Sequence, residues 1–265
     1  MPDTLPPPAF YTPGNTILIL GAVPQEITRL VSALQGARKR SLWGIPYWEG
    51  TLGAHKVVVA ITGIGKVYTA MTSTLFMAEL APRLVLMTGT GARINQALRT
   101  GDVIVAEVLN EHDYGSLTRE DMVYRPFNSP DDGAEIENRF VPMAPLLEAA
   151  DRAIASYAPP EVTENGPAYR VAVRRGVVVS SDLFGMTEAR IATLRTLFKA
   201  DISEMESAPL ARICQTFGVP CLVVRAGSNA AQEAPNDDYL RLGPIAADQA
   251  ARFTLHLLDH FQAKS

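Results

Sequence analysis

Short apolar runs alternate with longer amphipathic stretches along most of the chain. A short, continuous apolar run bounded by turn residues is typical of a strand that is buried on both faces. The first such run is Ile17–Val23. The same pattern predicts strands at Leu84–Met87, Val103–Leu109, Val171–Ser180 and Cys221–Val224, and a hairpin of Pro46–Leu52 with Lys56–Ile61 around the turn Gly53–His55.

Helices are predicted between these strands. Pro24 opens the first helix, because proline fits the first turn of a helix and Glu26 complements its positive end. Other helices are predicted from Lys66 to about Leu80, at Met143–Tyr157, Glu188–Phe198 and Met205–Phe217, and from about Ile245 to Phe261. Strands that alternate with helices predict an α/β fold with a largely parallel or mixed sheet covered on both faces.

The chain shows no break in composition that would mark a domain boundary. Residues 15–265 are therefore expected to form a single domain. Residues 1–14 are expected to be a flexible, Pro-rich arm and lack the pattern of a signal peptide. Asn110–Val141 is the least regular stretch and is expected to be a long loop, a candidate lid over a functional site.

The 265 residues carry 24 Lys+Arg and 28 Asp+Glu, and this net charge of −4 argues against nucleic acid as the main partner. No apolar run approaches the ~20 residues of a membrane span. Cys214 and Cys221 are too few for a disulfide scaffold and are expected to be buried thiols in a reducing cytoplasm. His256 and His260 share a helix face without a third ligand, so a metal site is not expected.

Known cofactor motifs fail on specific residues. Tyr68 stands where a dinucleotide fingerprint after Gly63 and Gly65 requires glycine, and Ala60 with Val67 breaks the phosphate-loop pattern. No cofactor is therefore expected. The chain also has no Gly-x-Ser-x-Gly elbow, so a catalytic triad of the α/β-hydrolase type has no support. Glycine and polar residues gather instead at strand ends, where ligands bind in open α/β sheets. These ends are Gly21–Ala22, Gly89–Gly91 and Gly227–Asn229.

Ala200–Ala208 and Val224–Asn229 resemble segments of the purine nucleoside phosphorylase and nucleosidase superfamily, and most closely its 5′-methylthioadenosine/S-adenosylhomocysteine nucleosidase branch. The resemblance implies a three-layer αβα sandwich with a central mixed sheet and a homodimer or larger homo-oligomer. It also implies cleavage of the bond between ribose and a purine base. The matching segments are, in order, Gly21–Glu26, Thr62–Val67, Thr88–Ala92, Ser181–Phe184, and Met205–Glu206 with Arg225–Asn229.

The resemblance also bears on whether water or phosphate accepts the ribose. Phosphorylases of the superfamily carry arginines at the positions of Met87 and Gln25, and a phosphate dianion needs such positive partners. The nucleosidases carry a glutamate at the position of Glu26, which orients and activates water. The resemblance therefore implies an N-glycosidase that hydrolyses a 5′-substituted purine nucleoside. A phosphorylase and a non-catalytic nucleoside-binding protein are the alternatives. The candidate phosphate ligands of such a phosphorylase are Arg29, Arg93 and Lys66.

The resemblance assigns roles at the ribose and at the reacting centre. Glu206 would grip both ribose hydroxyls, and Met205 would lie against the sugar. Glu26 would activate water, with Arg225 as a further catalytic group. Thr90 and Gly21 would position the water or an anion. The alternative for Glu26 and Glu206 is an acid that complements a helix N-terminus, and Glu204 is expected to be exposed or structural.

At the base, Phe184 would stack on the purine beside Gly91, or else be a core residue. Asn229 stands where the nucleosidase branch has an aspartate that protonates N7 of adenine. Asparagine cannot act as a general acid, but it can donate and accept hydrogen bonds. Futalosine hydrolase and some phosphorylases that handle 6-oxopurines resemble this chain in carrying asparagine there, so a 6-oxopurine is a candidate base. Asp182 is a candidate for bracing the loop that carries Phe184. The aromatic candidates for the 5′ pocket are Tyr114, Phe127 and Phe140.

Overall fold

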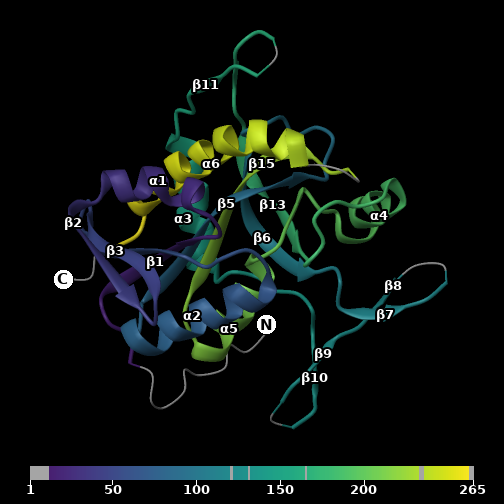
Figure 1. The fold of residues 1–265 in the computed structure, drawn as a ribbon, viewed down its shortest axis with the longest axis horizontal. Helices are drawn as coiled ribbons and strands as arrows, with labels where there is room; N and C mark the ends of the chain where they lie inside the picture. Colours follow the sequence, from purple (N-terminus) through teal and green to yellow (C-terminus); the bar gives the residue numbers. More distant parts are fainter. Residues whose placement is uncertain (1–11, 120–121, 131, 165, 233–235, 263–265) are drawn as a thin grey trace.

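The computed structural model describes residues 12–119, 122–130, 132–164, 166–232 and 236–262. A nine-stranded sheet crosses the molecule in the order β14-β13-β6-β15-β5-β1-β4-β3-β2 (Figure 1). Both parallel and antiparallel pairs occur, which confirms the mixed sheet. The strands are β1 (Thr16–Gly21), β2 (Gln35–Leu42), β3 (Ile45–Leu52), β4 (His55–Ile61), β5 (Leu84–Arg93), β6 (Val103–Glu111), β13 (Val173–Ser180), β14 (Ile202–Glu204) and β15 (Cys221–Ala230).

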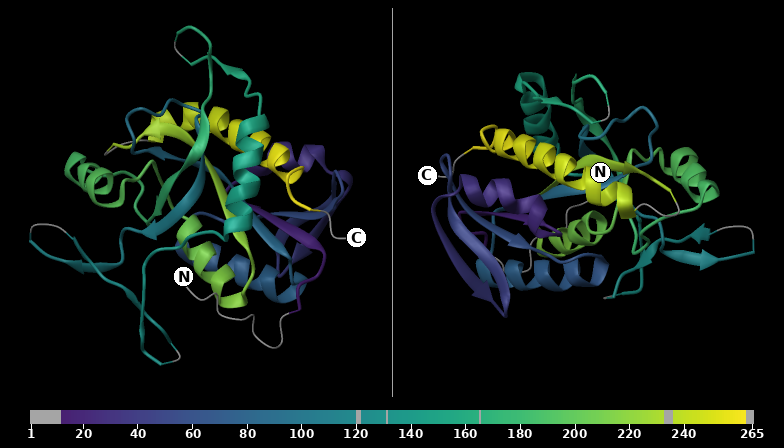
Figure 2. Two further views of the ribbon diagram at one scale, coloured as in Figure 1. Left: turned by 180° about the vertical axis from the view of Figure 1, so that it is seen from behind. Right: turned by 45° about the horizontal axis from the view of Figure 1, so that its top comes forward.

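Helices cover both faces of the sheet, as the two views in Figure 2 show. Along β1, Ile17 and Ile19 pack into the core under α1, α3 and α6, whereas Leu18 and Leu20 pack into the core under α2 and α5. A strand buried on both faces explains the continuous apolar run. The helices are α1 (Pro24–Ala33), α2 (Lys66–Leu80), α3 (Ala144–Ser156), α4 (Glu188–Thr193) with a π-helical continuation (Leu194–Phe198), α5 (Ser207–Phe217) and α6 (Asn236–Leu258).

The three-layer αβα sandwich is therefore confirmed, with differences in detail. β2 was not predicted, because its sequence Gln35–Leu42 is largely polar and exposed. β14 is an unpredicted strand of three residues that lies just before the segment predicted to be helical from Met205. The last helix begins at Asn236, before the predicted Ile245, and carries Pro244 in its interior. His55 begins β4 instead of standing in the turn, and it is buried.

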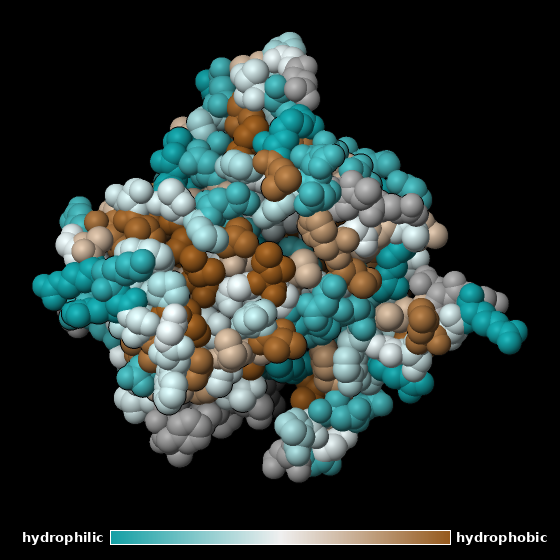
Figure 3. All heavy atoms as spheres, viewed as in Figure 1, coloured by the Kyte–Doolittle hydropathy of each residue, from teal (hydrophilic) through white to brown (hydrophobic). Residues whose placement is uncertain are grey.

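Asn110–Val141 differs most from the expected long loop. Most of it forms two small hairpins that project from the body of the molecule (Figure 1). Mostly hydrophilic residues cover their outer ends (Figure 3). The hairpins consist of β7 (Gly115–Leu117) with β8 (Met122–Tyr124), and β9 (Phe127–Asn128) with β10 (Glu135–Ile136); a third projecting hairpin joins β11 (Glu161–Val162) to β12 (Tyr169–Arg170).

Other expectations can be placed briefly. Most of the Pro-rich arm lies outside the described residues. None of the described helices is long and apolar enough to cross a membrane. Cys214 and Cys221 are free thiols, and Cys214 is buried in α5.

Candidate active site

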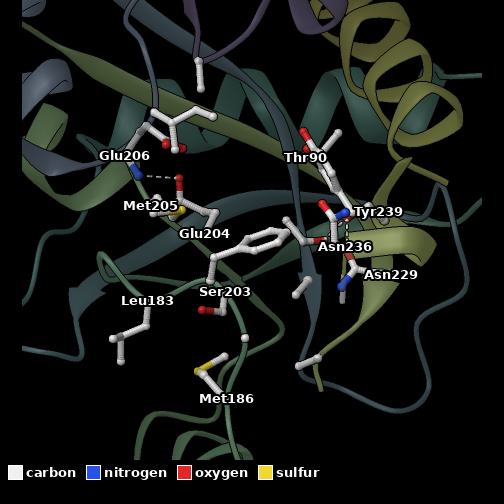
Figure 4. A pocket seen from close by; sticks show the side chains of 18 of the residues that line it. Thr90, Leu183, Met186, Ser203, Glu204, Met205, Glu206, Asn229, Asn236 and Tyr239 are labelled. Carbon is white, nitrogen blue, oxygen red and sulfur yellow. Dashed lines mark hydrogen bonds between the residues drawn. The ribbon is translucent and has the colours of Figure 1, made fainter. Parts of the chain in front are cut away.

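A cavity of about 410 Å³ opens at the carboxyl end of the sheet (Figure 4). It falls within the size range of small-molecule sites. Thr90 and Gly91 reach it from β5, and Ser228 and Asn229 reach it from β15. The other walls come from Ala22–Val23, Glu26, Ile64, Ala92, Leu183–Met186, Ser203–Glu206, Ala231–Gln232, Asn236 and Tyr239–Leu240.

Glu26 stands in the first turn of α1 and is almost completely buried. One carboxylate oxygen accepts the backbone N–H groups of Ala22 at 2.7 Å and Val23 at 3.4 Å. The other accepts the N–H of Thr90 at 2.8 Å and its hydroxyl at 3.1 Å. Glu26 therefore complements the N-terminus of α1, as its structural alternative predicted, and it also forms part of the cavity wall. Gly89 permits this approach, because a Cβ atom there would lie 2.6 Å from the carboxylate of Glu26.

Arg225 lies behind the cavity and is fully buried on β15. Its guanidinium donates to Glu206 at 3.2 Å and also to Glu204, and it stands 3.8 Å from Glu26. It does not line the cavity. One cation therefore faces three buried carboxylates, and this wall carries excess negative charge.

The surroundings of Glu206 strongly affect its ionisation. Burial raises its pKa from 4.5 to about 8, and the nearby carboxylates of Glu204 and Glu26 raise it as well. Arg225 and the backbone N–H of Gly65, which donates to Glu206 at 2.9 Å, oppose the rise. Burial would lower the pKa of Arg225, but the surrounding carboxylates raise it overall, so Arg225 stays charged.

Glu204 was expected to be either exposed or structural, and it is buried and structural. It accepts the backbone N–H groups of Glu206 and Ser207 at 3.0 Å and the hydroxyl of Ser207 at 2.8 Å. Ser180 donates to its other oxygen. Glu204 thereby satisfies N–H groups at the start of α5 that have no partner inside the helix, and it holds Glu206 in place.

The opposite end of the cavity is neutral. Phe184 is 54% exposed and meets Tyr239 edge to face, with ring centroids 5.8 Å apart. This exposure rules out the core alternative for Phe184. Asn229 is buried; its carbonyl accepts the Ser228 hydroxyl at 2.9 Å, and its NH₂ group donates to the carbonyl of Ala230 at 3.0 Å.

The structure brings most of the predicted site residues to this one cavity. Glu26, Thr90, Gly91, Phe184, Met205, Glu206 and Asn229 all line it. Gly21 does not, and its carbonyl accepts the backbone N–H of Thr62 at 2.8 Å. A Cβ atom at Gly21 would lie 2.7 Å from Ile27, so the glycine serves close packing of β1 against α1.

None of the described residues of the long segment lines the cavity, so these residues form no lid over it within one chain. Phe140 is buried and bridges to Leu109 in the core, which corrects its assignment to the 5′ pocket. The rings of Tyr114 and Phe127 contact each other, with centroids 4.5 Å apart. The carboxylate of Asp182 accepts the backbone N–H of Lys66 at 2.8 Å, so it links the loop before Phe184 to the start of α2.

Several cavity residues were missed from the sequence, among them Tyr239 and Ser203. Tyr239 lies in the first turn of α6, and its hydroxyl accepts the Gln25 amide at 3.0 Å. Ser203 lies on β14 and contacts the buried His112. Tyr239 follows Asp237 and Asp238, a pair of acids that signals a helix start. A helix predicted from there would have placed Tyr239 near the strand end at Asn229.

The chain is similar to known proteins in sequence and in fold. Residues 16–259 match the family model described as the phosphorylase superfamily. The chain is 31% identical over 221 residues to a 5′-methylthioadenosine/S-adenosylhomocysteine nucleosidase of Shewanella baltica, covering 83% of this chain and 86% of the relative. It is 29% identical over 248 residues to a nucleosidase of the same name from Mycobacterium bovis, covering 92% and 96%.

Two solved structures share the fold. The nucleosidase of Neisseria meningitidis in complex with methylthio-immucillin-A matches with a TM-score of 0.79 and 26% identity, over 94% of this chain and all of that one. The futalosine hydrolase of Helicobacter pylori matches with a TM-score of 0.78 and 27% identity, over 93% of this chain and 98% of that one.

Proposed function

The chain belongs to the phosphorylase superfamily, and we propose that its cavity hydrolyses the bond between ribose and base in a 5′-substituted purine nucleoside. The observation that carries the proposal is the charge of the cavity wall, where Glu26, Glu204 and Glu206 surround the single cation of Arg225. As the glycosidic bond breaks, positive charge develops on the ribose. Buried negative charge stabilises that charge more than it stabilises the neutral substrate.

The same wall favours water over phosphate as the acceptor. No lysine, arginine or histidine is among the described residues that line the cavity. A phosphate dianion would face carboxylates without a positive partner. The three cations considered as phosphate ligands are engaged elsewhere: Arg29 with Asp248, Arg93 with the carbonyl of Leu98, and Lys66 with Glu111 and Asp113.

In this proposal Glu206 accepts the ribose hydroxyls and Met205 lies against the sugar. Glu26 and Thr90 hold the attacking water, and Arg225 acts behind them by fixing the position of Glu206. Because the pKa of Glu206 is about 8, only part of the free protein carries the ionised carboxylate near neutral pH. The ionised form is the reactive one in this proposal, since its charge is then in place before positive charge develops on the ribose.

Asn229 bears on which base is cleaved. Its carbonyl and one N–H are bound to Ser228 and Ala230, which leaves the second N–H as a donor for the base. A donor suits O6 or N7 of a 6-oxopurine and opposes the amino group of adenine. We therefore include a 6-oxopurine nucleoside in the proposed substrate class, beside the substrates for which the curated relatives are named.

A homodimer in the cytoplasm is the last part of this proposal. Apolar side chains at the start of α2 are exposed, including Val67 at 78% and Tyr68 at 60%. Ile64, which is also exposed, lines the cavity, so a second subunit on this face would sit beside the site. Light scattering coupled to gel filtration would give the mass, and Val67→Glu should shift it toward the monomer. A wild-type protein that runs as a monomer contradicts this part.

A panel of purine nucleosides, with and without phosphate, tests the function. We expect release of free base and free ribose derivative from at least one 5′-substituted nucleoside, at a rate that phosphate does not change. A strict requirement for phosphate would indicate a phosphorylase. Binding of nucleosides without any turnover would indicate a non-catalytic protein.

A further inference from the structure

A buried histidine connects the cavity wall to the projecting part of the molecule. His112 follows β6 directly and is completely buried. Its ring Nε2 lies 3.2 Å from the hydroxyl oxygen of Ser203. Its Nδ1 lies 3.3 Å from the guanidinium of Arg190, which also donates to the backbone carbonyl of His112.

These contacts fix which ring nitrogen carries the proton. A guanidinium can donate hydrogen bonds but cannot accept them, so Nδ1 beside Arg190 must be the acceptor. Burial, followed by the positive charge of Arg190, lowers the pKa of His112 to about 4, so the ring is neutral near pH 7. The single ring proton therefore sits on Nε2 and points at Ser203.

The role of the Ser203 hydroxyl follows from that proton. Its oxygen accepts from His112, so its own hydrogen remains to be donated. Within the part of the chain that the structure describes, no acceptor is recorded for it. Ser203 lines the cavity, so this donor is available to a molecule that binds there.

The position of Ser203 places this donor at the neutral end of the cavity. β14 pairs with β5 at Ser203 and Ala92, and β15 pairs with β5 on the other side at Gly227 and Gly91. Ser203 and Asn229 therefore flank the end of β5 from opposite sides. In Figure 4, Ser203 lies beside Leu183 and Met186, away from Glu206.

We propose that Ser203 is a specificity-determining residue that donates a hydrogen bond to an acceptor atom of the purine base, and that His112 is the positioning residue that keeps its hydroxyl in the donor role. The inference rests on the proposed function, because it requires a purine in this cavity. Together with the free N–H of Asn229, it gives the neutral end two donors. Two donors favour a base with two acceptors on its exposed edge, as O6 and N7 provide.

A thermodynamic cycle on base binding tests the role of Ser203. The dissociation constants of hypoxanthine, 3-deazahypoxanthine, 7-deazahypoxanthine and unsubstituted purine would be measured calorimetrically for the wild type and for Ser203→Ala. The three analogues lack N3, N7 and O6 respectively. Ser203→Ala should weaken hypoxanthine binding about 3- to 10-fold, and should not weaken further the one analogue that lacks the acceptor read by Ser203.

The controls separate this inference from the proposed function. Ser156→Ala, an exposed serine at the end of α3, should leave all four constants unchanged. Equal losses on all four bases with Ser203→Ala, or no loss on any, would overturn the role of Ser203. A wild type that binds none of the bases and cleaves no nucleoside would instead contradict the proposed function.

Variants of His112 test the positioning role. His112→Gln keeps an N–H donor near the place of Nε2 and should retain part of the discrimination between hypoxanthine and the identified analogue. His112→Phe fills the space without a donor and should reduce that discrimination to the level of Ser203→Ala. If folded His112→Phe protein discriminates as well as the wild type, His112 does not position Ser203.

Discussion

The two ends of the cavity differ in how their polar groups are held. At the end with Glu206 and Arg225, each charged group has several partners within the protein, and the carboxylates outnumber the cation. At the end with Phe184 and Asn229, the side chains are neutral and Phe184 is half exposed.

This difference divides the work of the site. A charge that stabilises a transition state must be in place beforehand, because reorganising dipoles during the reaction would cost part of the benefit. The network of Glu204, Ser207 and Arg225 provides that rigidity around Glu206. A base that must enter and leave needs complementary donors and an open stacking face, which Asn229 and Phe184 offer. We therefore expect changes at the charged end to affect rate and changes at the neutral end to affect substrate preference.

The largest effect is expected from Glu206→Gln. The ribose hydroxyls would lose an ionised acceptor, and two hydrogen bonds to a charged group contribute about 1.5–3 kcal/mol each. The value of kcat should fall by roughly 100- to 10,000-fold. Circular dichroism should show an intact fold, because glutamine can still accept from Gly65. Near-normal turnover would contradict the assignment of Glu206 to the ribose.

The second largest effect is expected in the pH dependence of kcat/KM of the wild type. If substrate binds when Glu206 is ionised, kcat/KM should rise about tenfold per pH unit below a pKa of about 8 and level off above it. A flat profile from pH 6 to 9 would show that another group controls the reaction.

The same pKa predicts how stability changes with pH. The carboxyl pKa is about 8 in the folded protein and 4.5 ordinarily, so the folded state binds the extra proton. This contribution to stability is complete below pH 4.5 and is lost as pH rises to about 8. Between pH 5 and pH 8, the melting temperature of the wild type should therefore fall more than that of Glu206→Gln. Melting curves of both proteins at the two pH values test this expectation.

A smaller, substrate-dependent effect is expected from Asn229→Asp. Aspartic acid can deliver a proton to N7 of adenine, whereas the asparagine N–H cannot. A mismatched buried amide costs about 1–3 kcal/mol, so activity on adenine nucleosides should rise about tenfold to a hundredfold, and activity on hypoxanthine nucleosides should fall. Efficient cleavage of 5′-methylthioadenosine by the wild type, without a gain in the variant, would show that another group supplies the proton.

The smallest effect is expected from Phe184→Ala. If Phe184 stacks on the base as proposed, removing this half-exposed ring should cost about 0.5–1.5 kcal/mol. KM should therefore rise roughly 2- to 10-fold, while kcat changes little. Leu197→Ala is a matched control, since Leu197 is similarly exposed and lies away from the cavity. A large fall in kcat for Phe184→Ala would remove the distinction between the two ends.

The sequence by itself determined most strands of the central sheet and most of the helices. Continuous apolar runs such as Ile17–Val23 predict buried strands, because local periodicity reflects which faces of an element are covered. The resemblance to the nucleosidase branch pointed to Glu26, Glu206 and Asn229, and all three line one cavity. Polar β2 carried no such signal, and it is a strand because β3 pairs with it.

Tertiary structure decided which side chains meet at the cavity. β5 lies between β1 and β15 and also pairs with β14, and this order brings Glu26, Arg225 and Glu204 together. Local sequence does not encode strand order, because the backbone groups of any strand can pair with those of any other strand. For the same reason, the sequence did not show that Glu204 is buried and caps α5. Nor did it show that His112 contacts Ser203, which lies 91 residues further along the chain. The charge balance of the site and the hydrogen-bond donors at its neutral end are therefore properties of the assembled sheet.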